Sequence, residues 1–251
     1  MKEITIGIIG SGMIGANVAR LSVAAGLKVI ICNSRGPKTL SGLVSELGAK
    51  AQAAAVEEVA AIADLIILAI PFAAYKKLPA DLLARKTIID TLNYYPQRDG
   101  SIPEVKTDTI STSELVQRHF YLSQVVRAIN NMDFVRLLTS ARPSEASDRS
   151  ALPIAGDNVS AKETVAAFLD RIGYDTVDIG ALAESWRSEP TTPIYVSPYM
   201  HRETSYMENH VSVDTFMTAP GRVVTRKEVE TLVKSAVRHD KMFGLLPVFK
   251  E

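Results

Sequence analysis

Short apolar runs recur along the first 180 positions of the chain, and segments with apolar residues at every third or fourth position separate most of them. A continuous apolar run is typical of a strand buried in a parallel sheet, whereas the longer period is typical of a helix with one buried face. Strands that alternate with helices predict an α/β fold with a doubly wound, mostly parallel sheet of the Rossmann type and right-handed crossovers. The predicted strands lie at residues 4–9, 27–33, 49–53, 63–70, 87–91, 124–129, 151–156 and 175–179.

Capping signals mark the ends of several predicted helices. Residues 111–114, 160–163 and 225–228 each have the Ser/Thr-x-x-Glu spacing of a capping box. Pro153 indicates that the seventh strand pairs on one side only or carries a bulge. The helix that begins near residue 225 is expected to bury Val229, Leu232, Val233, Ala236 and Val237.

The pattern changes near residue 181, which divides the chain into a dinucleotide-binding domain (1–181) and a C-terminal extension (182–251). Pro190, Pro193 and Pro198 exclude long regular structure, so residues 188–224 are predicted to form an arm or lid. The arm mixes aromatic and methionine residues with polar ones and cannot form a core alone, and such residues are enriched at interfaces. We therefore expect a homodimer in which the arm of one subunit packs against the other and reaches its cofactor cleft.

A glycine-rich turn follows the first predicted strand. Gly10-Ser11-Gly12-Met13-Ile14-Gly15 has the G-x-G-x-x-G spacing of a dinucleotide-binding turn. Gly10 would permit the sharp turn, Gly12 would let backbone N–H groups approach a pyrophosphate, and Gly15 would let the helix lie close to the sheet. The alternative is a glycine-rich turn with a structural role alone.

The segment after the second predicted strand indicates which cofactor binds. Many NAD enzymes place Asp or Glu here to bind the ribose 2′-hydroxyl, but this chain has Asn33-Ser34-Arg35-Gly36-Pro37-Lys38 and no carboxylate. Arg35 can bind a 2′-phosphate with two donors, Ser34 can add a hydrogen bond and Lys38 a charge. The pattern favours NADP(H), and the alternative is a solvated basic turn.

Three further strand ends are expected at the same edge of the sheet. Ala69, Ile70 and Pro71 are candidates for contact with the ribose or the nicotinamide. Asn93 is the first candidate for a hydrogen bond to the nicotinamide, because its amide both donates and accepts, and Asn130-Asn131 could bind the acceptor. Plain strand ends and Asx turns remain the alternative interpretations.

Composition narrows the class of protein. The 251 residues include 28 basic and 28 acidic side chains, so charge gives no indication of nucleic acid or membrane partners. Cys32 is the single cysteine, which excludes an internal disulfide and fits a reducing cytoplasm best. No signal-peptide core precedes the glycine turn, and the longest apolar run, at 65–70, is too short to cross a bilayer. A cytoplasmic protein is expected.

The sequence identifies no catalytic acid or base and predicts no metal site. The four histidines are scattered and are expected to have surface or packing roles: His119, His201, His210 and His239. Direct hydride transfer to a flavin-like ring needs mainly the alignment of two rings, whereas reduction of a carbonyl or imine needs a proton donor such as Tyr94 or Tyr95. A non-catalytic NADPH sensor is the third possibility.

Several segments together resemble the NADP oxidoreductases of the coenzyme F420-dependent type, over roughly residues 3–200: residues 10–15, 33–37, 90–100, 152–157 and 180–187. The resemblance implies that NADP binds the glycine turn, that Ser34 and Arg35 hold the 2′-phosphate, and that a deazaflavin stacks on the nicotinamide. By the same resemblance Ile70, Pro71, Asn93 and Asn130 lie near the nicotinamide. Two features depart from the family: a longer tail beyond residue 200, and Ala128-Ile129-Asn130-Asn131 at the expected deazaflavin-facing segment. The acceptor is therefore open between a deazaflavin, a flavin and another small molecule.

Overall fold

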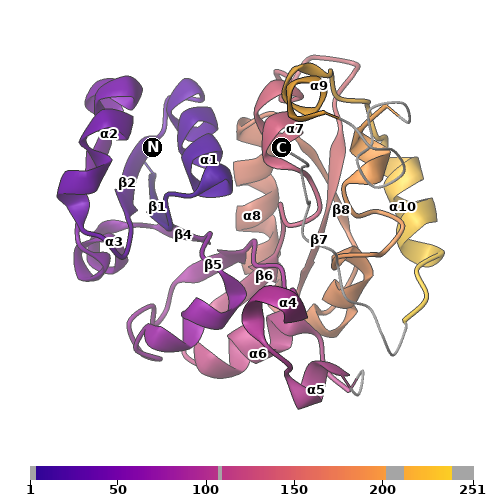
Figure 1. The fold of residues 1–251 in the computed structure, drawn as a ribbon, viewed down its shortest axis with the longest axis horizontal. Helices are drawn as coiled ribbons and strands as arrows, with labels where there is room; N and C mark the ends of the chain where they lie inside the picture. The colour runs from indigo at the N-terminus through magenta and orange to yellow at the C-terminus, as the bar shows by residue number, and fades with distance from the viewer. Residues whose placement is uncertain (1–3, 107–108, 202–211, 239–251) are drawn as a thin grey trace.

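The computed structural model describes residues 4–106, 109–201 and 212–238 (Figure 1). One sheet contains all the named strands, in the order β3-β2-β1-β4-β5-β6-β7-β8. The strands are β1 (Thr5–Ile9), β2 (Lys28–Cys32), β3 (Ala51–Ala53), β4 (Leu65–Leu68), β5 (Thr87–Asp90), β6 (Gln124–Arg127), β7 (Ala151–Gly156) and β8 (Asp175–Asp178). All eight sequence-predicted strands are thus confirmed, in a mostly parallel sheet.

The direction of the sheet changes once. The pairs from β3 to β6 are parallel, β6 and β7 are antiparallel, and β7 and β8 are parallel to each other. Only Ala155 and Gly156 of β7 pair with β6, whereas Pro153 pairs with Val177 of β8. The one-sided pairing predicted from Pro153 is therefore present at that residue.

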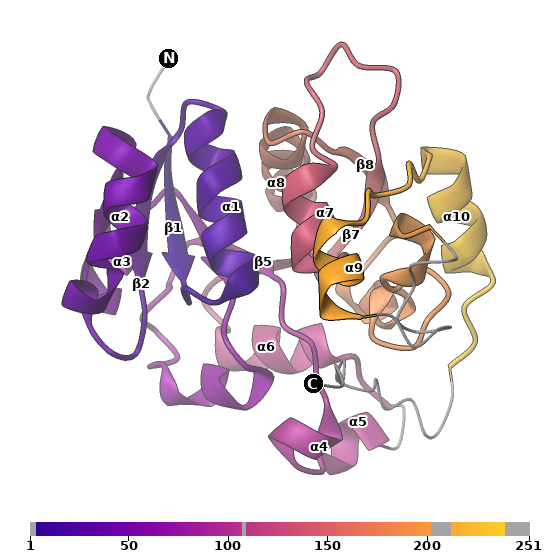
Figure 2. The same ribbon diagram turned by 45° about the horizontal axis from the view of Figure 1, so that its top comes forward.

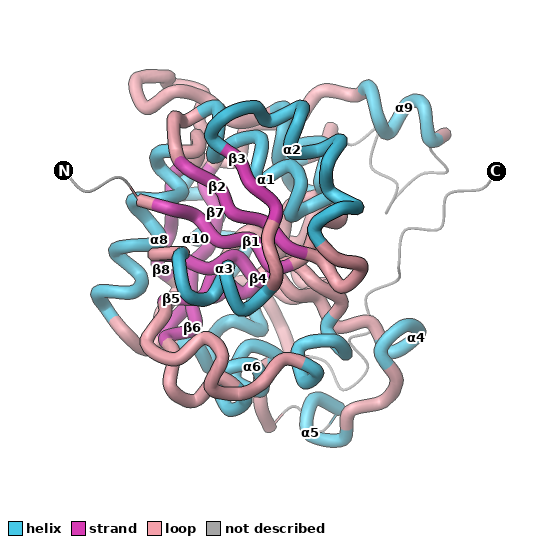
Figure 3. Tube along the Cα trace, turned by 90° about the vertical axis from the view of Figure 1, so that its left-hand side faces the viewer, coloured by secondary structure: helices cyan, strands magenta, loops and turns pink. Residues whose placement is uncertain are grey.

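Helices cover both faces of the sheet (Figures 1 and 3). The α-helices are α1 (Met13–Ala24), α2 (Ser41–Leu47), α3 (Val56–Ile62), α4 (Pro96–Asp99), α5 (Pro103–Lys106), α6 (Thr112–His119), α7 (Phe134–Thr139), α8 (Val159–Arg171), α9 (Val213–Thr218) and α10 (Arg226–Lys234). The 3₁₀ helices are η1 (Pro37–Leu40), η2 (Gly48–Lys50), η3 (Phe72–Lys77), η4 (Leu182–Ser188) and η5 (Ser197–Tyr199).

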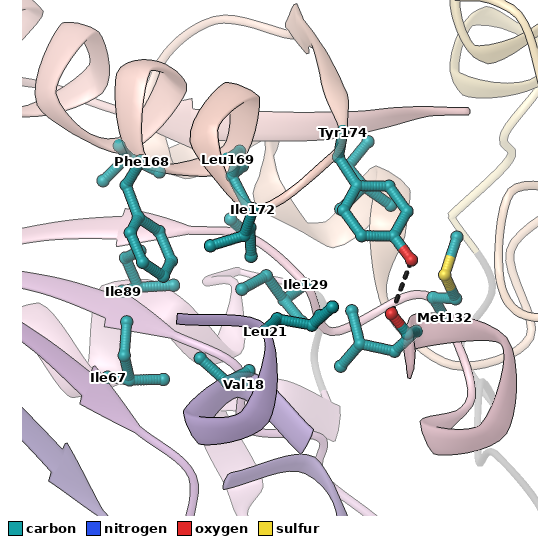
Figure 4. Close-up of a cluster of buried hydrophobic side chains, with 14 of the residues drawn as sticks. Val18, Leu21, Ile67, Ile89, Ile129, Met132, Phe168, Leu169, Ile172 and Tyr174 are labelled. Carbon is teal, nitrogen blue, oxygen red and sulfur yellow. Dashed lines mark hydrogen bonds between the residues drawn. The ribbon is translucent and has the colours of Figure 1, made fainter. Parts of the chain in front are cut away.

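The strand side chains alternate between two apolar layers. In β4, Leu65 and Ile67 belong to the layer that α1 and α8 cover, and Ile66 and Leu68 belong to the layer that α3 and α6 cover. Figure 4 shows the first layer, where side chains of α1 and α8 meet those of the central strands. Because both faces are buried, the central strands are continuous apolar runs, which made them easy to predict.

Two details of the helices differ from the sequence-based expectations. The capping box predicted at 160–163 is wrong: Asn158 is the N-cap of α8, and its Oδ1 accepts from the N–H of Ala161. Because Asn158 is the N-cap, the helix begins two residues earlier than predicted, and Ser160 lies in its first turn. Val237 is 61% exposed rather than buried, because α10 ends at Lys234. The capping box at 111–114 is confirmed, and Thr225 caps α10.

The described part of the C-terminal extension packs on its own sheet. Leu182, Ile194, Tyr199 and Val224 are fully buried, and the hydroxyl of Tyr199 donates to the carbonyl of Ala151 at 2.9 Å. In Figure 2, α9 lies beside α7, and the rings of Phe134 and Phe216 are 5.9 Å apart there. The arm thus covers an intramolecular surface, and the homodimer stays a prediction.

Among the described residues, no helix combines the length and the apolar character needed to span a membrane.

Candidate functional site

A continuous cleft runs along the carboxyl ends of the parallel strands. It consists of two cavities, one of about 400 Å³ that we call the Arg35 cavity and one of about 630 Å³ that we call the Tyr95 cavity. Both cavities share four wall residues: Gly12, Ala69, Ile70 and Pro71. Ligands of open α/β sheets bind at this edge, outside the strand ends.

The glycine turn lies where the two cavities meet, and its three glycines differ in their surroundings. Gly10 has φ +112°, and a Cβ there would lie 2.1 Å from the carbonyl oxygen of Ala69. A Cβ on Gly15 would lie 1.9 Å from the carbonyl oxygen of Gly10, so only glycine lets α1 approach the turn. A Cβ on Gly12 would meet nothing within 4 Å. Gly10 and Gly15 are therefore required by the fold, whereas Gly12 leaves open space on the cleft wall that a pyrophosphate would fill.

The loop after β2 forms the polar wall of the Arg35 cavity. Asn33 shapes this loop: its Oδ1 accepts from the N–H of Arg35 at 2.9 Å, and its Nδ2 donates to Ser11 at 3.2 Å. Ser34 and Arg35 are exposed and line the cavity. The Arg35 guanidinium has no ion-pair partner among the residues that the structure describes. It is thus available to an anion.

Other residues of the Arg35 cavity were not predicted. Lys77 in η3 adds a second cation to the wall, and Val56, Ala74 and Leu78 provide an apolar slot. Lys38, proposed from the sequence, lies in η1 and is exposed, but it does not line the cavity. Cys32 also lines the wall, and burial raises the pKa of its thiol to about 11.

The Tyr95 cavity is built from segments that lie far apart in the sequence. The glycine turn contributes Met13 and Ile14, and the loops after β4, β5 and β6 contribute most of the opposite walls. The C-terminal arm adds three residues from the same chain: Tyr195, Val196 and Phe216. The arm thus lines the cleft of its own chain, whereas the sequence predicted that it reaches the cleft of a partner subunit, which stays a prediction.

A buried ion pair holds Asn93 in place. Arg127 and Asp90 are fully buried, with 3.2 Å between Nη1 and Oδ2, and Nη2 of Arg127 donates to Oδ1 of Asn93 at 3.1 Å. The Asn93 Nδ2 donates to the carbonyl of Asn130 at 2.8 Å and to the Tyr195 hydroxyl at 3.4 Å. The amide of Asn93 is thus oriented by the charge behind it and makes its hydrogen bonds within the protein.

Tyr94 and Tyr95 have different environments. Tyr95 lines the cavity, and its hydroxyl hydrogen-bonds the hydroxyl of Tyr195. Burial raises the pKa of Tyr95, and the hydrogen bond with Tyr195 opposes that rise. Tyr94 instead packs in the core against Phe72, and its hydroxyl donates to the carbonyl of Gly100. Of the two tyrosines, Tyr95 is the one placed at the cleft.

Most of the sequence-predicted residues meet at this cleft, with some exceptions. The cavity walls contain Gly10, Ser11, Gly12, Met13, Ile14, Asn33, Ser34, Arg35, Ala69, Ile70, Pro71, Asn93 and Asn130. Ala128 is fully buried in the apolar layer, and Asn131 is buried and donates to the Tyr199 hydroxyl at 3.0 Å. Neither lines the cleft, because the chain turns directly after β6, where Ile129 has a φ of +65°.

Neither of the two histidines that the structure describes lines the Arg35 cavity or the Tyr95 cavity. His119 Nε2 lies 2.8 Å from the carbonyl of Leu78, and its ring contacts Tyr75 and Phe120. His201 is exposed, and His210 and His239 fall outside the described residues. The packing role expected for His119 is confirmed.

Sequence reasoning missed several residues of the Tyr95 cavity, among them Arg98, Met132, Asp133, Phe134, Tyr195 and Phe216. Asp133 carried a usable signal, since an Asp followed by an apolar helical stretch predicts an N-cap. The aromatic residues of the arm indicated an interface, but the sequence did not give the positions of Tyr195 and Phe216, because these depend on long-range packing.

Residues 5–94 match the family described as NADP oxidoreductase, coenzyme F420-dependent. This part of the chain is therefore similar to that family. It contains the glycine turn, the Arg35 loop and the strand end at Pro71, and it ends at Tyr94. The matched domain is that of an NADP-dependent oxidoreductase, so the resemblance noted in the sequence is confirmed over this range.

One curated protein is similar to a longer stretch of the chain. Metalloreductase STEAP3 of Rattus norvegicus is 30% identical over 195 residues, which cover 77% of this chain and 37% of that protein. The chain spans less than two fifths of the length of the curated relatives that it matches.

Two solved structures share the fold. A hypothetical protein from Sinorhizobium meliloti has a TM-score of 0.68 at 25% identity, covering 76% of this chain and 93% of that one. A candidate F420-dependent NADP reductase from Arthrobacter sp. FB24 has a TM-score of 0.60 at 27% identity, covering 71% of this chain and 86% of that one. These likenesses extend well beyond residue 94.

Proposed function

We propose that the protein transfers a hydride between NADP(H) and a planar acceptor, a deazaflavin of the coenzyme F420 type, a flavin or a similar ring. The observation that carries the proposal is the single cleft in which the Arg35 cavity and the Tyr95 cavity join across the glycine turn. An extended dinucleotide laid over Gly12 would place its 2′-phosphate at one end and its nicotinamide at the other.

The residues present fit NADP(H) at the first end. Arg35 and Ser34 are exposed on the wall, none of the described residues that line the Arg35 cavity is a carboxylate, and Lys77 adds positive charge. A guanidinium that binds a phosphate with two donors gives strong, oriented recognition. The backbone at Gly12 is open to the cleft, as a pyrophosphate requires.

The second end favours ring stacking. Ile70, Pro71, Ile129, Met132 and Phe216 give the Tyr95 cavity a largely apolar wall. When bound, NADPH supplies a hydride from its nicotinamide ring, and apolar walls align two stacked rings and exclude water. The chain would contribute orientation rather than a proton-transfer group.

A second candidate function is the reduction of a small carbonyl or imine compound. The hydroxyl pair of Tyr95 and Tyr195 favours it, because a tyrosine hydroxyl can donate a proton to the oxygen or nitrogen that becomes negatively charged. Such a reductase would depend on Tyr95, whereas transfer between two rings would not.

One assay separates these functions. The pure protein with NADPH is mixed separately with a deazaflavin, FMN, FAD, a carbonyl panel and, because of the metalloreductase relative, a reducible metal chelate, while oxidation of the nicotinamide is followed. We expect turnover with a planar ring, and turnover with a carbonyl compound alone would support the second candidate. Tight NADPH binding without any turnover would contradict both and favour an NADPH sensor.

The variant Tyr95→Phe sharpens the result. With a planar acceptor we expect its turnover to stay within about threefold of the unmutated rate, whereas loss of a proton donor lowers a rate by roughly 10²–10⁴. Tyr94→Phe is the matched control, since its hydroxyl lies outside the cleft and bonds Gly100.

A further inference from the structure

Lys77 and Arg35 line the same cavity from two different strand ends. Arg35 lies in the loop after β2, and Lys77 is the last residue of η3, the short helix that follows β4. In the sheet, β2 and β4 are the two neighbours of β1, and the glycine turn follows β1. The two cations therefore approach a cavity of about 400 Å³ from either side of the glycine turn.

The period of η3 decides which of its side chains meet the cavity. Side chains three positions apart lie on the same face of a 3₁₀ helix. Pro71, which precedes the helix, shares one face with Ala74 and Lys77, and all three line the Arg35 cavity. Phe72 and Tyr75 share a second face and are fully buried. The burial of this second face thus fixes η3 so that Lys77 lies on the cavity wall.

The neighbouring lysine lies on the third face of η3. Lys76 is exposed and does not line the cavity, and its Nζ lies 5.9 Å from the centre of the Tyr75 ring. Lys77 is exposed too, but it has no hydrogen-bond or ion-pair partner among the residues that the structure describes. Two adjacent lysines thus carry the same charge, and Lys77 is the one that lines the cavity.

The charge on the cavity wall is unbalanced. Among the described residues that line the Arg35 cavity, Arg35 and Lys77 are charged, and no Asp or Glu accompanies them. Two cations at one cavity repel each other, and an anion between them removes this cost. A phosphate monoester carries about 1.5 to 2 negative charges at pH 7, which is more than one arginine neutralises. The wall therefore fits a phosphate monoester better than a group with a single charge.

The position of Lys77 along η3 distinguishes between the phosphates of a dinucleotide. Pro71 lines both cavities, as does Gly12, where the pyrophosphate is expected. Ala74 and Lys77 line the Arg35 cavity alone. A 3₁₀ helix rises about 2 Å per residue, so the backbone of Lys77 lies roughly 12 Å along η3 from that of Pro71. Lys77 is therefore at the outer end of the cavity, away from the place expected for the pyrophosphate.

We propose that Lys77 binds the 2′-phosphate of NADP(H) from the side of the glycine turn opposite to Arg35. This inference rests on the proposed function, since it requires the adenosine end of the cofactor to lie in the Arg35 cavity. A guanidinium holds two phosphate oxygens in one plane, whereas an ammonium is a point charge that approaches a further oxygen from another direction. NAD(H) has a hydroxyl group in place of this phosphate, so Lys77 is a specificity-determining residue.

The test measures the dissociation constants of NADPH and NADH for the unmutated protein, Lys77→Met and Lys76→Met, by fluorescence titration in one buffer. Methionine retains an apolar stem like that of lysine and removes the charge. We expect Lys77→Met to bind NADPH about tenfold more weakly, and NADH within about twofold of the unmutated value. Lys76→Met is the matched control on the neighbouring face and should bind both cofactors as the unmutated protein does.

The conservative variant Lys77→Arg separates charge from shape. It retains a cation at the same place, so it should keep most of the preference for NADPH. If Lys77→Arg instead loses the preference as Lys77→Met does, the charge at this position does not hold the phosphate, and the inference is contradicted.

Two further results would overturn the inference. Lys77→Met could keep the full affinity for NADPH, or it could lose the same factor for NADH, which would place Lys77 at a part that the two cofactors share. In both cases an unmutated protein that prefers NADPH leaves the proposed function intact. An unmutated protein that binds neither cofactor, or both equally, would contradict the NADP(H) assignment itself, so the two failures are distinguishable.

Discussion

The two halves of the cleft obtain their polar character in different ways. In the Arg35 cavity, Arg35 and Ser34 are exposed, and the guanidinium has no ion-pair partner among the described residues. In the Tyr95 cavity, Asn93, Asn130 and Tyr195 are hydrogen-bonded to one another or to nearby backbone, behind a fully buried ion pair. The polar side chains of the Arg35 cavity are thus available to a charged ligand, whereas those of the Tyr95 cavity are already held by hydrogen bonds within the protein.

The difference fits the ligand part that we propose for each half, a phosphate in the Arg35 cavity and a ring in the Tyr95 cavity. A phosphate carries its own charge and is recognised by a cation on an exposed loop. A ring in an apolar cavity has few polar atoms, so its orientation depends on walls whose own side chains are fixed. Substitutions in the two halves should therefore separate into effects on affinity and effects on stability.

The largest effect is expected from Arg127→Met, which breaks the buried pair with Asp90. Asp90 would be left buried and charged, so the free energy of unfolding should fall by roughly 3–5 kcal/mol. Urea denaturation measures it. Arg20→Met is the control, because its pair with Glu46 is exposed and should contribute less than about 1 kcal/mol. Equal losses in the two variants would show that the network does not support the Tyr95 cavity.

Within the glycine turn, one substitution is expected to lower stability and another to lower the affinity for NADPH. Gly15→Ala places a Cβ 1.9 Å from the Gly10 carbonyl oxygen, so we expect a loss of roughly 1–3 kcal/mol in the free energy of unfolding. Gly12→Ala meets no protein atom within 4 Å, so the melting temperature should stay unchanged while NADPH binds about tenfold or more weakly. Unchanged NADPH affinity in a folded Gly12→Ala protein would place the pyrophosphate elsewhere.

In the Arg35 cavity we expect an effect on affinity alone. Arg35→Ala removes one charge-assisted contact of about 1.5–3 kcal/mol, so NADPH should bind roughly ten- to a hundredfold more weakly. NADH affinity and thermal stability should not change, because the guanidinium is exposed. Isothermal titration with both cofactors tests this, and an equal loss for NADH would argue against a 2′-phosphate contact.

The smallest effect on activity is expected from His119→Gln. His119 lies against Tyr75 and Phe120 beneath η3, not in the cleft, so turnover should stay within about threefold of the unmutated rate. Stability should fall by about 1 kcal/mol through the lost ring contacts. Steady-state kinetics with the best acceptor provides the check, and a hundredfold loss of turnover would reveal an unrecognised general acid.

How much the sequence could predict differs between the same two halves. Most of the Arg35 cavity comes from segments that directly follow β1, β2 and β4, whereas the unpredicted Ala74, Lys77 and Leu78 lie farther along the chain, in η3 or at its end. The position of a local motif such as the glycine turn or the Asn33–Lys38 loop in the fold can therefore be predicted from the strand that precedes it. The strands were equally predictable, since a buried parallel strand is a continuous apolar run.

The Tyr95 cavity could be predicted only in part. Asn93 and Asn130 follow strands and were found, but Tyr195 and Phe216 come from an arm without periodicity, and only the folded chain brings them to the cleft. Their amide and hydroxyl partners are also set by Arg127, which looks like an ordinary strand residue in the sequence. The sequence also did not show which of the two adjacent tyrosines faces the cleft; only the folded structure shows that Tyr95 lines it and Tyr94 does not.

We propose that the Arg35 half of the cleft selects NADP(H) over NAD(H). The most direct measurement is the dissociation constant of NADPH and of NADH for the unmutated protein, in one buffer and by one method. Because Arg35 and Ser34 each offer a contact to the 2′-phosphate, we expect NADPH to bind about tenfold to a hundredfold more tightly. Equal affinity for the two cofactors would contradict the assignment.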